Sequence, residues 1–232
     1  MSDDATLVLF DVDGTLIESH RVGRDAMDAA GRSLFGEDFT FKGVTFAGAL
    51  DGSILDQALT AAGRTIEPAA REAFFAAYLD ALTQRLTRPP RPRALPGVER
   101  ALADLAGPTP HGPGRLGLLT GNHRSAARLK LHAAGIATDP FTVNAFGDEG
   151  ATRPDLVELA LRRYREALGR DVSPARTVVI GDTPNDMEAA RAHGCVAVGV
   201  ATGSYDADAL IAAGADRVLD DLRQWAGLDV LR

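Results

Sequence analysis

Several polar residues stand where apolar runs of the sequence end, and their side chains are of the types that bind a hard cation. They are Asp11, Asp13, Thr120, Asp182 and Asp186. If the apolar runs are parallel strands of one sheet, the carboxyl ends of the strands share an edge, and these side chains converge there. Carboxylates gathered at one place repel each other strongly. A bound cation would remove that repulsion.

Mg²⁺ is the cation that this set of residues predicts. It takes one or two carboxylates, keeps several waters and shares its remaining positions with a substrate phosphate. We expect Asp11 and Asp182 as ligands together with a backbone carbonyl near Asp13, and Gly14 lets the backbone turn tightly beside them.

Two other interpretations of DVDG, residues 11–14, are weaker. A calcium loop of the EF-hand type also begins with alternating Asp, but its glycine is the sixth residue and a helix precedes it. Here the glycine is the fourth residue and an apolar run precedes it. A solvated Asp-Gly turn is the plainer alternative, and the distant segment GDTPND, residues 181–186, argues against it.

The elements that must position these residues alternate in type along the chain. Apolar runs of strand length lie at 6–10, 115–120, 142–146, 177–180 and 195–200. Stretches with helical period lie between the later runs, at 125–134, 154–168 and 185–192. This alternation predicts an α/β fold with a Rossmann-like parallel sheet at its core.

Residues 18–90 differ in character from the rest of the chain. They hold helix-like stretches at 26–34, 53–62 and 68–86 and end in the proline-rich segment 87–97, which cannot continue a helix. We predict a core domain formed by residues 1–17 and 91–232, with residues 18–90 inserted as a helical cap domain.

Composition narrows the class of protein. The net charge of -7 and the pI near 5.2 leave no basic stripe for nucleic acid or for an anionic membrane surface. The start of the chain is acidic and its first apolar run is too short for a signal segment or a membrane span. The single cysteine, Cys195, lies in an apolar stretch and is expected to be a buried small side chain. These features predict a cytoplasmic protein.

Three motifs in order carry a resemblance to a known family. DVDGT at 11–15, LLT at 118–120 and GDTPND at 181–186, with a helical insertion after the first, resemble the haloacid dehalogenase superfamily. The chain is most similar to the phosphoglycolate phosphatase-like members with a helical cap, and residues 199–222 resemble their closing segment.

The resemblance implies a role for each matching residue. Asp11 would attack phosphorus and form an aspartyl-phosphate, as a carboxylate nucleophile can. Asp13 would protonate the leaving oxygen and later deprotonate a water; we expect the neighbouring carboxylate to raise its pKa for the first step. Thr120 would bind the transferring phosphoryl group, with the amide of Gly121 or Asn122 as second donor. The metal site would comprise Asp11, Asp13, Asp182 and Asp186, where Asp186 holds a metal water or the cationic side chain.

Arg153 is the one departure from the family pattern. The family places a lysine, often followed by proline, where this chain has Arg153-Pro154. Arginine keeps the charge and can fork onto phosphate oxygens, so we assign it to the phosphate site. The alternative is a surface arginine at a helix start. Lys42 and Lys130, the lysines of the chain, are not expected in position to replace it.

Several other sequence features have no expected role in catalysis, and some belong to the cap. GPGRLG, residues 112–117, precedes an apolar run instead of following one, so it is expected to be a loop and not a dinucleotide motif. His123 could touch a substrate but is expected to have no chemical role. His20, Arg21 and Lys42 are candidate contacts from the cap, but they are expected to be solvated surface groups. The glycine-rich stretch 43–53 is the part of the cap expected to approach a ligand.

The sequence thus predicts a Mg²⁺-dependent phosphatase acting on a small phosphate monoester, with phosphoglycolate the first candidate by resemblance. A dehalogenase is disfavoured because Asp13 supplies an acid that halide displacement does not need. A sugar phosphomutase on the same core and a non-catalytic regulatory module remain as alternatives. The expected partner is a small phosphorylated metabolite, and the expected state is a monomer or homodimer.

Overall fold

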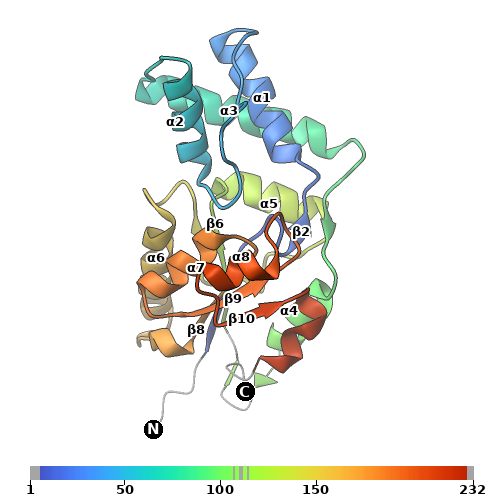
Figure 1. Cartoon of the computed structure of the whole chain (residues 1–232), viewed down its shortest axis with the longest axis vertical. Helices are drawn as coiled ribbons and strands as arrows, with labels where there is room; N and C mark the ends of the chain where they lie inside the picture. The colour runs from blue at the N-terminus through green and yellow to red at the C-terminus, as the bar shows by residue number, and fades with distance from the viewer. Residues whose placement is uncertain (1–5, 107, 110–111, 114, 229–232) are drawn as a thin grey trace.

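A six-stranded parallel sheet forms the centre of the computed structural model, which describes residues 6–106, 108–109, 112–113 and 115–228 (Figure 1). The sheet order is β10-β9-β8-β1-β6-β7. Its strands are β1 (Leu7–Phe10), β6 (Arg115–Thr120), β7 (Ala145–Phe146), β8 (Thr177–Gly181), β9 (Val196–Val200) and β10 (Arg217–Leu219). The Rossmann-like parallel core is confirmed.

The sequence of the central strand β1 is apolar throughout because the strand is buried on both faces. Val8 and Phe10 point into one hydrophobic cluster, whereas Leu7 and Leu9 point into the other. A parallel strand covered on both faces has no polar side to show. Helices α4 (Val98–Ala106) and α5 (Arg124–Ala133) cover the first face, and α6 (Arg153–Leu168), α7 (Pro184–Ala192) and α8 (Ala207–Ala212) cover the second.

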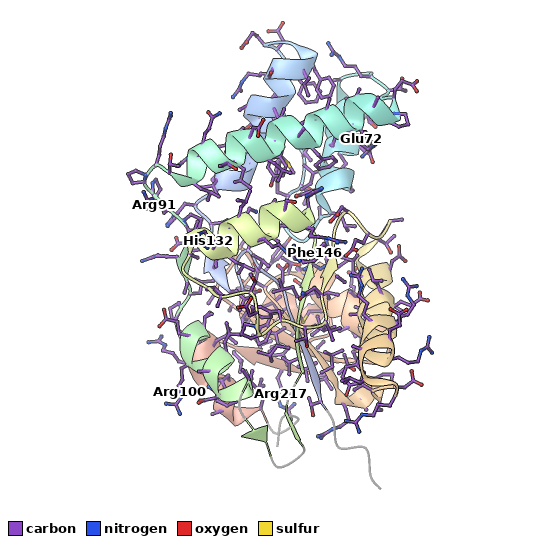
Figure 2. All side chains as sticks on the ribbon, turned by 180° about the vertical axis from the view of Figure 1, so that it is seen from behind. Glu72, Arg91, Arg100, His132, Phe146 and Arg217 are labelled. Atoms are coloured by element: carbon purple, nitrogen blue, oxygen red, sulfur yellow. The ribbon has the colours of Figure 1, made fainter. Side chains whose placement is uncertain are left out.

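The inserted residues 18–90 form a helical body above the sheet, and we call it the helical insertion (Figures 1 and 2). It contains α1 (Val22–Phe35), α2 (Asp51–Ala61) and α3 (Pro68–Leu86). They pack around an aromatic cluster that includes Phe41, Phe74 and Tyr78. Ala126 of α5 belongs to the same cluster, so the insertion packs on that helix of the core.

Both connections between the insertion and the sheet run through one short antiparallel ribbon. β2 (Ile17–Glu18) pairs with β3 (Arg93–Ala94), and the side chains of Glu18 and Arg93 form an ion pair of 2.5 Å. The exact domain boundaries, 1–17 with 91–232 and 18–90, stay a prediction.

The predicted strand at 142–146 is wrong in its first half. Regular pairing is limited to Ala145–Phe146, next to Leu119 and Thr120 of β6. The side chain of Asn144 takes the place of a backbone partner, because its Oδ1 accepts from the amide of Leu118 at 2.9 Å. A side chain that satisfies the neighbouring strand's backbone substitutes for the ladder there.

The segment GPGRLG is not simply a loop. Gly112–Pro113 forms β5, which pairs with β4 (Pro108–Thr109), and Arg115 already belongs to β6. Gly114 lies outside the described residues. As predicted, GPGRLG does not lead into a helix that could bind a phosphate, because β6 follows it directly.

Two expectations from composition can be compared with the structure. Cys195 is buried, as predicted, and burial raises the pKa of its thiol to about 11. Among the described residues, no helix is both long enough and apolar enough to cross a membrane.

Candidate active site

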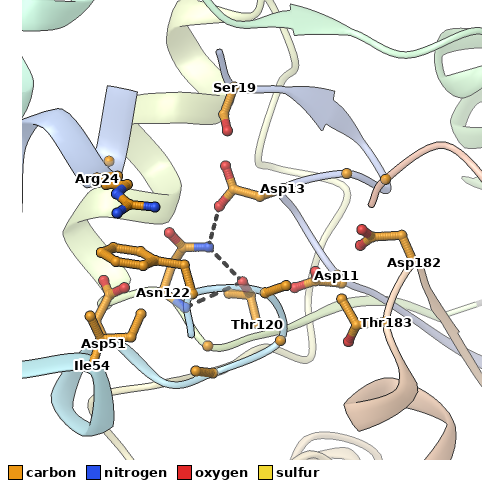
Figure 3. Close-up of a pocket in the computed structure, with 18 of the residues that line it drawn as sticks. Asp11, Asp13, Ser19, Arg24, Asp51, Ile54, Thr120, Asn122, Asp182 and Thr183 are labelled. Atoms are coloured by element: carbon orange, nitrogen blue, oxygen red, sulfur yellow. Dashed lines mark hydrogen bonds between the residues drawn. The ribbon is translucent and has the colours of Figure 1, made fainter. Parts of the chain in front are cut away.

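The carboxyl ends of β1, β6 and β8 bring the predicted residues together. Phe10 pairs with Leu118 on one side and Ile180 on the other, so the residues after each strand emerge side by side at one edge. A cavity of about 420 Å³ opens at this edge. Figure 3 shows Asp11, Asp13, Thr120 and Asp182 facing it.

Asp11, Asp182 and Asp186 form a compact cluster of carboxylates. All three are buried, and one oxygen of each lies within 4.8 Å of the others. Burial raises the pKa of Asp11 to about 6, with Arg153 opposing the shift and Asp186 and Asp13 adding to it. Burial also raises the pKa of Asp182 well above its usual range, and Asp11 and Asp186 raise it further.

This cluster fits a hard divalent cation. Oxygen-only donors at short mutual distance are the ligands that such ions prefer. Burial is the main cause of the raised pKa values of Asp11 and Asp182, and the neighbouring carboxylates raise both further in spite of Arg153; a bound cation would favour the charged form of each. The side chain of Asp13 is not part of the cluster; the sequence expected that residue to contribute a backbone carbonyl.

Two glycines leave room for the carboxylate of Asp182. A Cβ on Gly14 would lie 2.3 Å from Asp182 Oδ2, and one on Gly203 would lie 1.7 Å from the same atom. Gly14 also has φ of 80°, a left-handed conformation that favours glycine. The tight turn predicted at Gly14 therefore exists, and it packs directly against Asp182.

Arg153 is buried at the site instead of lying on the surface. Its side chain is 4% exposed, and Nη2 lies 2.8 Å from Asp11 Oδ1 and 2.5 Å from Asp186 Oδ1. The guanidinium also donates to the carbonyl oxygens of Leu119 and Gly48, at 3.2 and 3.3 Å. Burial lowers the pKa of Arg153, but Asp186 and Asp11 outweigh burial and raise it. The alternative of a solvated arginine is wrong.

Asp186 is oriented by the start of α7. Thr183 and Asp186 form a capping box, in which Asp186 Oδ2 accepts from the amide and the hydroxyl of Thr183 at 3.1 and 2.7 Å. The other oxygen, Oδ1, is thereby turned toward Arg153. Asp186 thus holds the cationic side chain of Arg153, which is one of the two roles proposed for it from the resemblance.

A second polar network joins Asp13 to the end of β6. Asn122 Nδ2 donates to Asp13 Oδ2 at 2.7 Å and to Thr120 Oγ1 at 2.8 Å (Figure 3). The amide of Asn122 points at Thr120 Oγ1 over a longer 3.4 Å. The carbonyl of Gly121 accepts from the amide of Asp51 at 2.8 Å. Thr120, Gly121 and Asn122, the residues for which the resemblance implies phosphate binding, all line the cavity.

Lys130 is a site residue that sequence reasoning missed. Its side chain is buried on α5, and Nζ donates to Asp13 Oδ2 at 2.7 Å and to Asn122 Oδ1 at 2.6 Å. The expectation that it cannot replace Arg153 agrees with these contacts, because Arg153 and not Lys130 pairs with Asp11. The available signal was its place on the buried stripe of the helix, with Ala126 and Leu131.

The expected direction of the Asp13 pKa is wrong for this arrangement of side chains. Enclosure raises the pKa of Asp13, but the charge of Lys130 and hydrogen bonds from Lys130 and Asn122 outweigh it and lower the pKa below its usual value. The expectation considered only the neighbouring Asp11, whereas the dominant partner comes from a helix more than a hundred residues away in sequence.

Asp51 at the start of α2 is a second residue that the sequence did not single out. Its amide donates to Gly121 O at 2.8 Å, and its Oδ2 accepts from the amide of His123 at 2.7 Å. Burial raises the pKa of Asp51 to about 6, although Lys130 and the His123 amide lower it. These reciprocal bonds join the helical insertion to the loop after β6.

The insertion supplies much of the cavity wall. Residues 46–49 and 51 line it, so the stretch 43–53 does approach the site as predicted. Lys42 is exposed as expected, and Arg21, also exposed, borders the cavity. His20 is half-buried, lies 3.4 Å from Glu18 and does not line the cavity. The ring of His123 stacks on Phe75 with centroids 5.3 Å apart and caps α5.

Comparison with known proteins agrees in sequence and in structure. A family model described as haloacid dehalogenase-like hydrolase matches residues 5–194. A phosphoglycolate phosphatase of Neisseria meningitidis is 32% identical over 204 residues, which cover 86% of this chain and 81% of that protein.

Solved structures share the whole architecture. CbbY from Rhodobacter sphaeroides, in complex with phosphate, is 25% identical with a TM-score of 0.74, covering 98% of this chain and 99% of that one. A hydrolase from Pseudomonas syringae, 24% identical, has a TM-score of 0.70 over 97% of this chain and 98% of that one; this second likeness supports the fold alone.

Proposed function

The chain belongs to the haloacid dehalogenase-like hydrolases, and from that premise we propose that it is a Mg²⁺-dependent phosphatase of small phosphate monoesters. The observation that carries the proposal is the position of Asp11. Its carboxylate stands at the end of the central strand and borders the cavity. It lies beside a buried cation, Arg153, and two further carboxylates.

In the proposed first step, a carboxylate oxygen of Asp11 attacks phosphorus and the bond from phosphorus to the leaving oxygen breaks. The product is an aspartyl-phosphate on Asp11, and the leaving oxygen takes a proton from Asp13. In the second step a water gives a proton to Asp13 and attacks phosphorus, which releases phosphate and restores the Asp11 carboxylate. A covalent carboxylate catalyst divides one difficult displacement into two easier ones.

Asp13 is arranged for such proton exchange at one of its oxygens. Lys130 and Asn122 both donate to Oδ2, so Oδ1 is the oxygen through which a proton would pass. The low pKa of Asp13 in the protein alone means that a dianionic phosphate ester bound close by would have to raise it, as a neighbouring negative charge does.

Donors for the phosphoryl group lie at the end of β6 and at the start of α6. We assign this role to the hydroxyl of Thr120, to the backbone amides of Gly121 and Asn122 and to the guanidinium of Arg153. Fixed donors aimed at the phosphoryl oxygens stabilise the charge of the transition state. Asp11 and Asp182 would hold Mg²⁺, with a carbonyl near Asp13 and with Asp186 behind them. The bound ion would supply further positive charge to the phosphoryl oxygens.

The size of the cavity supports a small substrate. The cavity between the sheet edge and the helical insertion has a volume of about 420 Å³, within the range of small-molecule sites. With the Neisseria meningitidis relative as a guide, we propose phosphoglycolate or a close analogue as substrate. We also propose that the protein acts in the cytoplasm on a soluble metabolite, as a monomer or homodimer.

Phosphate release from an aryl phosphate tests the proposed reaction. Wild type should release phosphate only with Mg²⁺, and Asp11→Asn should lose at least a thousandfold in kcat. Asp104→Asn, which alters a partly exposed carboxylate paired with Arg100, should retain full activity. Turnover that survives in Asp11→Asn would refute the mechanism. Interconversion of isomeric sugar phosphates without phosphate release would indicate the phosphomutase instead.

A further inference from the structure

The hydroxyl of Tyr78 is a buried polar group that the proposed mechanism does not use. Tyr78 lies on α3, is 0% exposed and lines the cavity. Its oxygen has no hydrogen-bond partner among the described residues. A phenol that is buried without a partner costs free energy, so such a group facing a cavity indicates a ligand atom that completes it.

Lys130 directs a second donor at the same place. Two of its hydrogen bonds go to Asp13 and Asn122, and an ammonium group has three N–H bonds. The missing side chain at Gly23 of α1 lets the two donors lie close together: a Cβ on Gly23 would lie 3.0 Å from Lys130 Nζ and 3.4 Å from the Tyr78 oxygen. All three residues line the cavity, so one ligand oxygen that enters between Lys130 and Tyr78 could accept from both.

The place between the two donors belongs to the leaving-group side of the cavity. The same Lys130 Nζ lies 2.7 Å from Asp13 Oδ2, and Asp13 is the residue proposed to protonate the leaving oxygen. Arg153 and the cluster of Asp11, Asp182 and Asp186 lie at the other pole of the site, where the phosphoryl group would bind. A group bound between the two donors is therefore attached to the alcohol, close to the ester oxygen.

We propose that Tyr78 and Lys130 together bind an anionic oxygen of the leaving group that enters between them. They thereby select phosphate esters of short hydroxy acids over esters of plain alcohols. The inference rests on the proposed phosphatase function and deepens it. A carboxylate suits the place because both protein groups are donors and one carries a positive charge.

Arg24 is the competing cation in the helical insertion. Its guanidinium lies 4.9 Å from the centre of the Phe46 ring and lines the cavity from α1, and Figure 3 shows it on the side that faces Asp13 and Asn122. If the carboxylate bound Arg24 instead, Tyr78 would not affect selectivity. The two possibilities are separable by single substitutions.

The test compares two esters of matched size, 2-phosphoglycolate and ethyl phosphate, which differ by a carboxylate against a methyl group. The measured quantity is the ratio of their kcat/KM values for the Mg²⁺-loaded enzyme. Tyr78→Phe keeps the ring stacked on Phe74 and removes only the oxygen. It should lower the ratio about tenfold, the size of one hydrogen bond to a charged group.

Gly23→Ala is a second variant, because its methyl group would lie 3.0 Å from Lys130 Nζ and 3.4 Å from the Tyr78 oxygen and would push the two donors apart. Gly23 has ordinary helical φ, so alanine should be compatible with α1, and the ratio should again fall about tenfold. Tyr164→Phe is the matched control: it removes the oxygen of another buried tyrosine, in the cluster under α6, and should leave the ratio unchanged.

Each other result overturns the inference in a recognisable way. A ratio near one for wild type, or a ratio that Tyr78→Phe leaves intact while Arg24→Met abolishes it, would refute the subsite with the phosphatase function still standing. Hydrolysis of neither ester, nor of any aryl phosphate, would refute the proposed function and the subsite together.

Discussion

Lys130 and Asp13 form an ion pair inside the cavity, with Nζ 2.7 Å from Oδ2 and the lysine side chain only 5% exposed. Because Lys130 lowers the pKa of Asp13, Lys130→Met should move the limb of the pH profile governed by Asp13 to higher pH. The kcat at pH 7 should fall about tenfold, since Asp13 and Asn122 lose the donor that orients them. Steady-state kinetics from pH 5 to pH 9 checks both effects.

The control for this change is Arg100→Met, which removes a cation from an exposed pair with Asp104. Its pH profile should coincide with that of wild type. A Lys130→Met profile that keeps the wild-type limb would show that Lys130 does not control the charge of Asp13.

Arg153→Met should destabilise the protein strongly. Arg153 pairs with both Asp11 and Asp186, and removing one partner of a buried pair costs about 3–5 kcal/mol. The free energy of unfolding of Arg153→Lys should lie between those of wild type and Arg153→Met. Lysine keeps the charge but loses the forked guanidinium that reaches Leu119 and Gly48. Urea unfolding without metal measures the free energy of unfolding.

Arg162→Met on the same helix is the matched control for Arg153. That residue pairs with Glu166 at the surface, so the free energy of unfolding should change by less than about 1 kcal/mol. Equal effects at the two positions would contradict the assignment of Arg153 to the buried cluster.

The positions of Asp11, Thr120 and Asp182 at one edge of the sheet could be predicted from the sequence, because they depend on a local pattern and one general rule. Each follows an apolar strand, and parallel strands of one sheet deliver their carboxyl ends to a shared edge. The helical period of α5 could place Lys130 on the buried side of that helix. The roles of Lys130 and Asp51 depend, however, on how the helical insertion and α5 pack together, and no local period encodes that packing.

The same distinction explains the errors in the fold. The run 142–146 has the composition of a strand, but a side-chain amide of Asn144 takes over the contact with Leu118. Whether a polar side chain replaces a backbone partner is decided by tertiary distance. The buried charge of Arg153, by contrast, could be predicted because a motif placed it.

Gly203→Ala should weaken metal binding without a backbone penalty. A Cβ at this position would lie 1.7 Å from Asp182 Oδ2, so the carboxylate must move away from Asp11. The Mg²⁺ concentration for half-maximal activity should rise about tenfold, the lower range for loss of a supporting contact at a metal site. Gly227→Ala, where nothing lies within 4 Å, should leave the Mg²⁺ dependence unchanged.

Asp51→Asn should change how stability depends on pH. Burial raises the pKa of Asp51 from 3.8 to about 6, so the folded state binds more protons than the unfolded state between those values. The wild type therefore loses stability from this residue as pH rises from about 4 to 6. Relative to wild type, the variant should gain about 2 kcal/mol in unfolding free energy between pH 4 and pH 8.

Urea unfolding of both proteins at several pH values gives this difference directly, because other titrating groups cancel in the comparison. Asparagine can still accept the amide of His123, so the bond at 2.7 Å has a replacement. Parallel pH profiles for the two proteins would mean that Asp51 carries its charge at no cost.

The paired ribbon of Ile17–Glu18 and Arg93–Ala94 gives the insertion two ends that are already neighbours. A segment whose ends meet can be exchanged for another of different length without changing the register of the central strands. The ribbon is thus a site at which one inserted segment can replace another, provided that the new segment covers the apolar side of α5 around Ala126. One catalytic edge can in this way acquire new substrates by replacing a single contiguous stretch of chain.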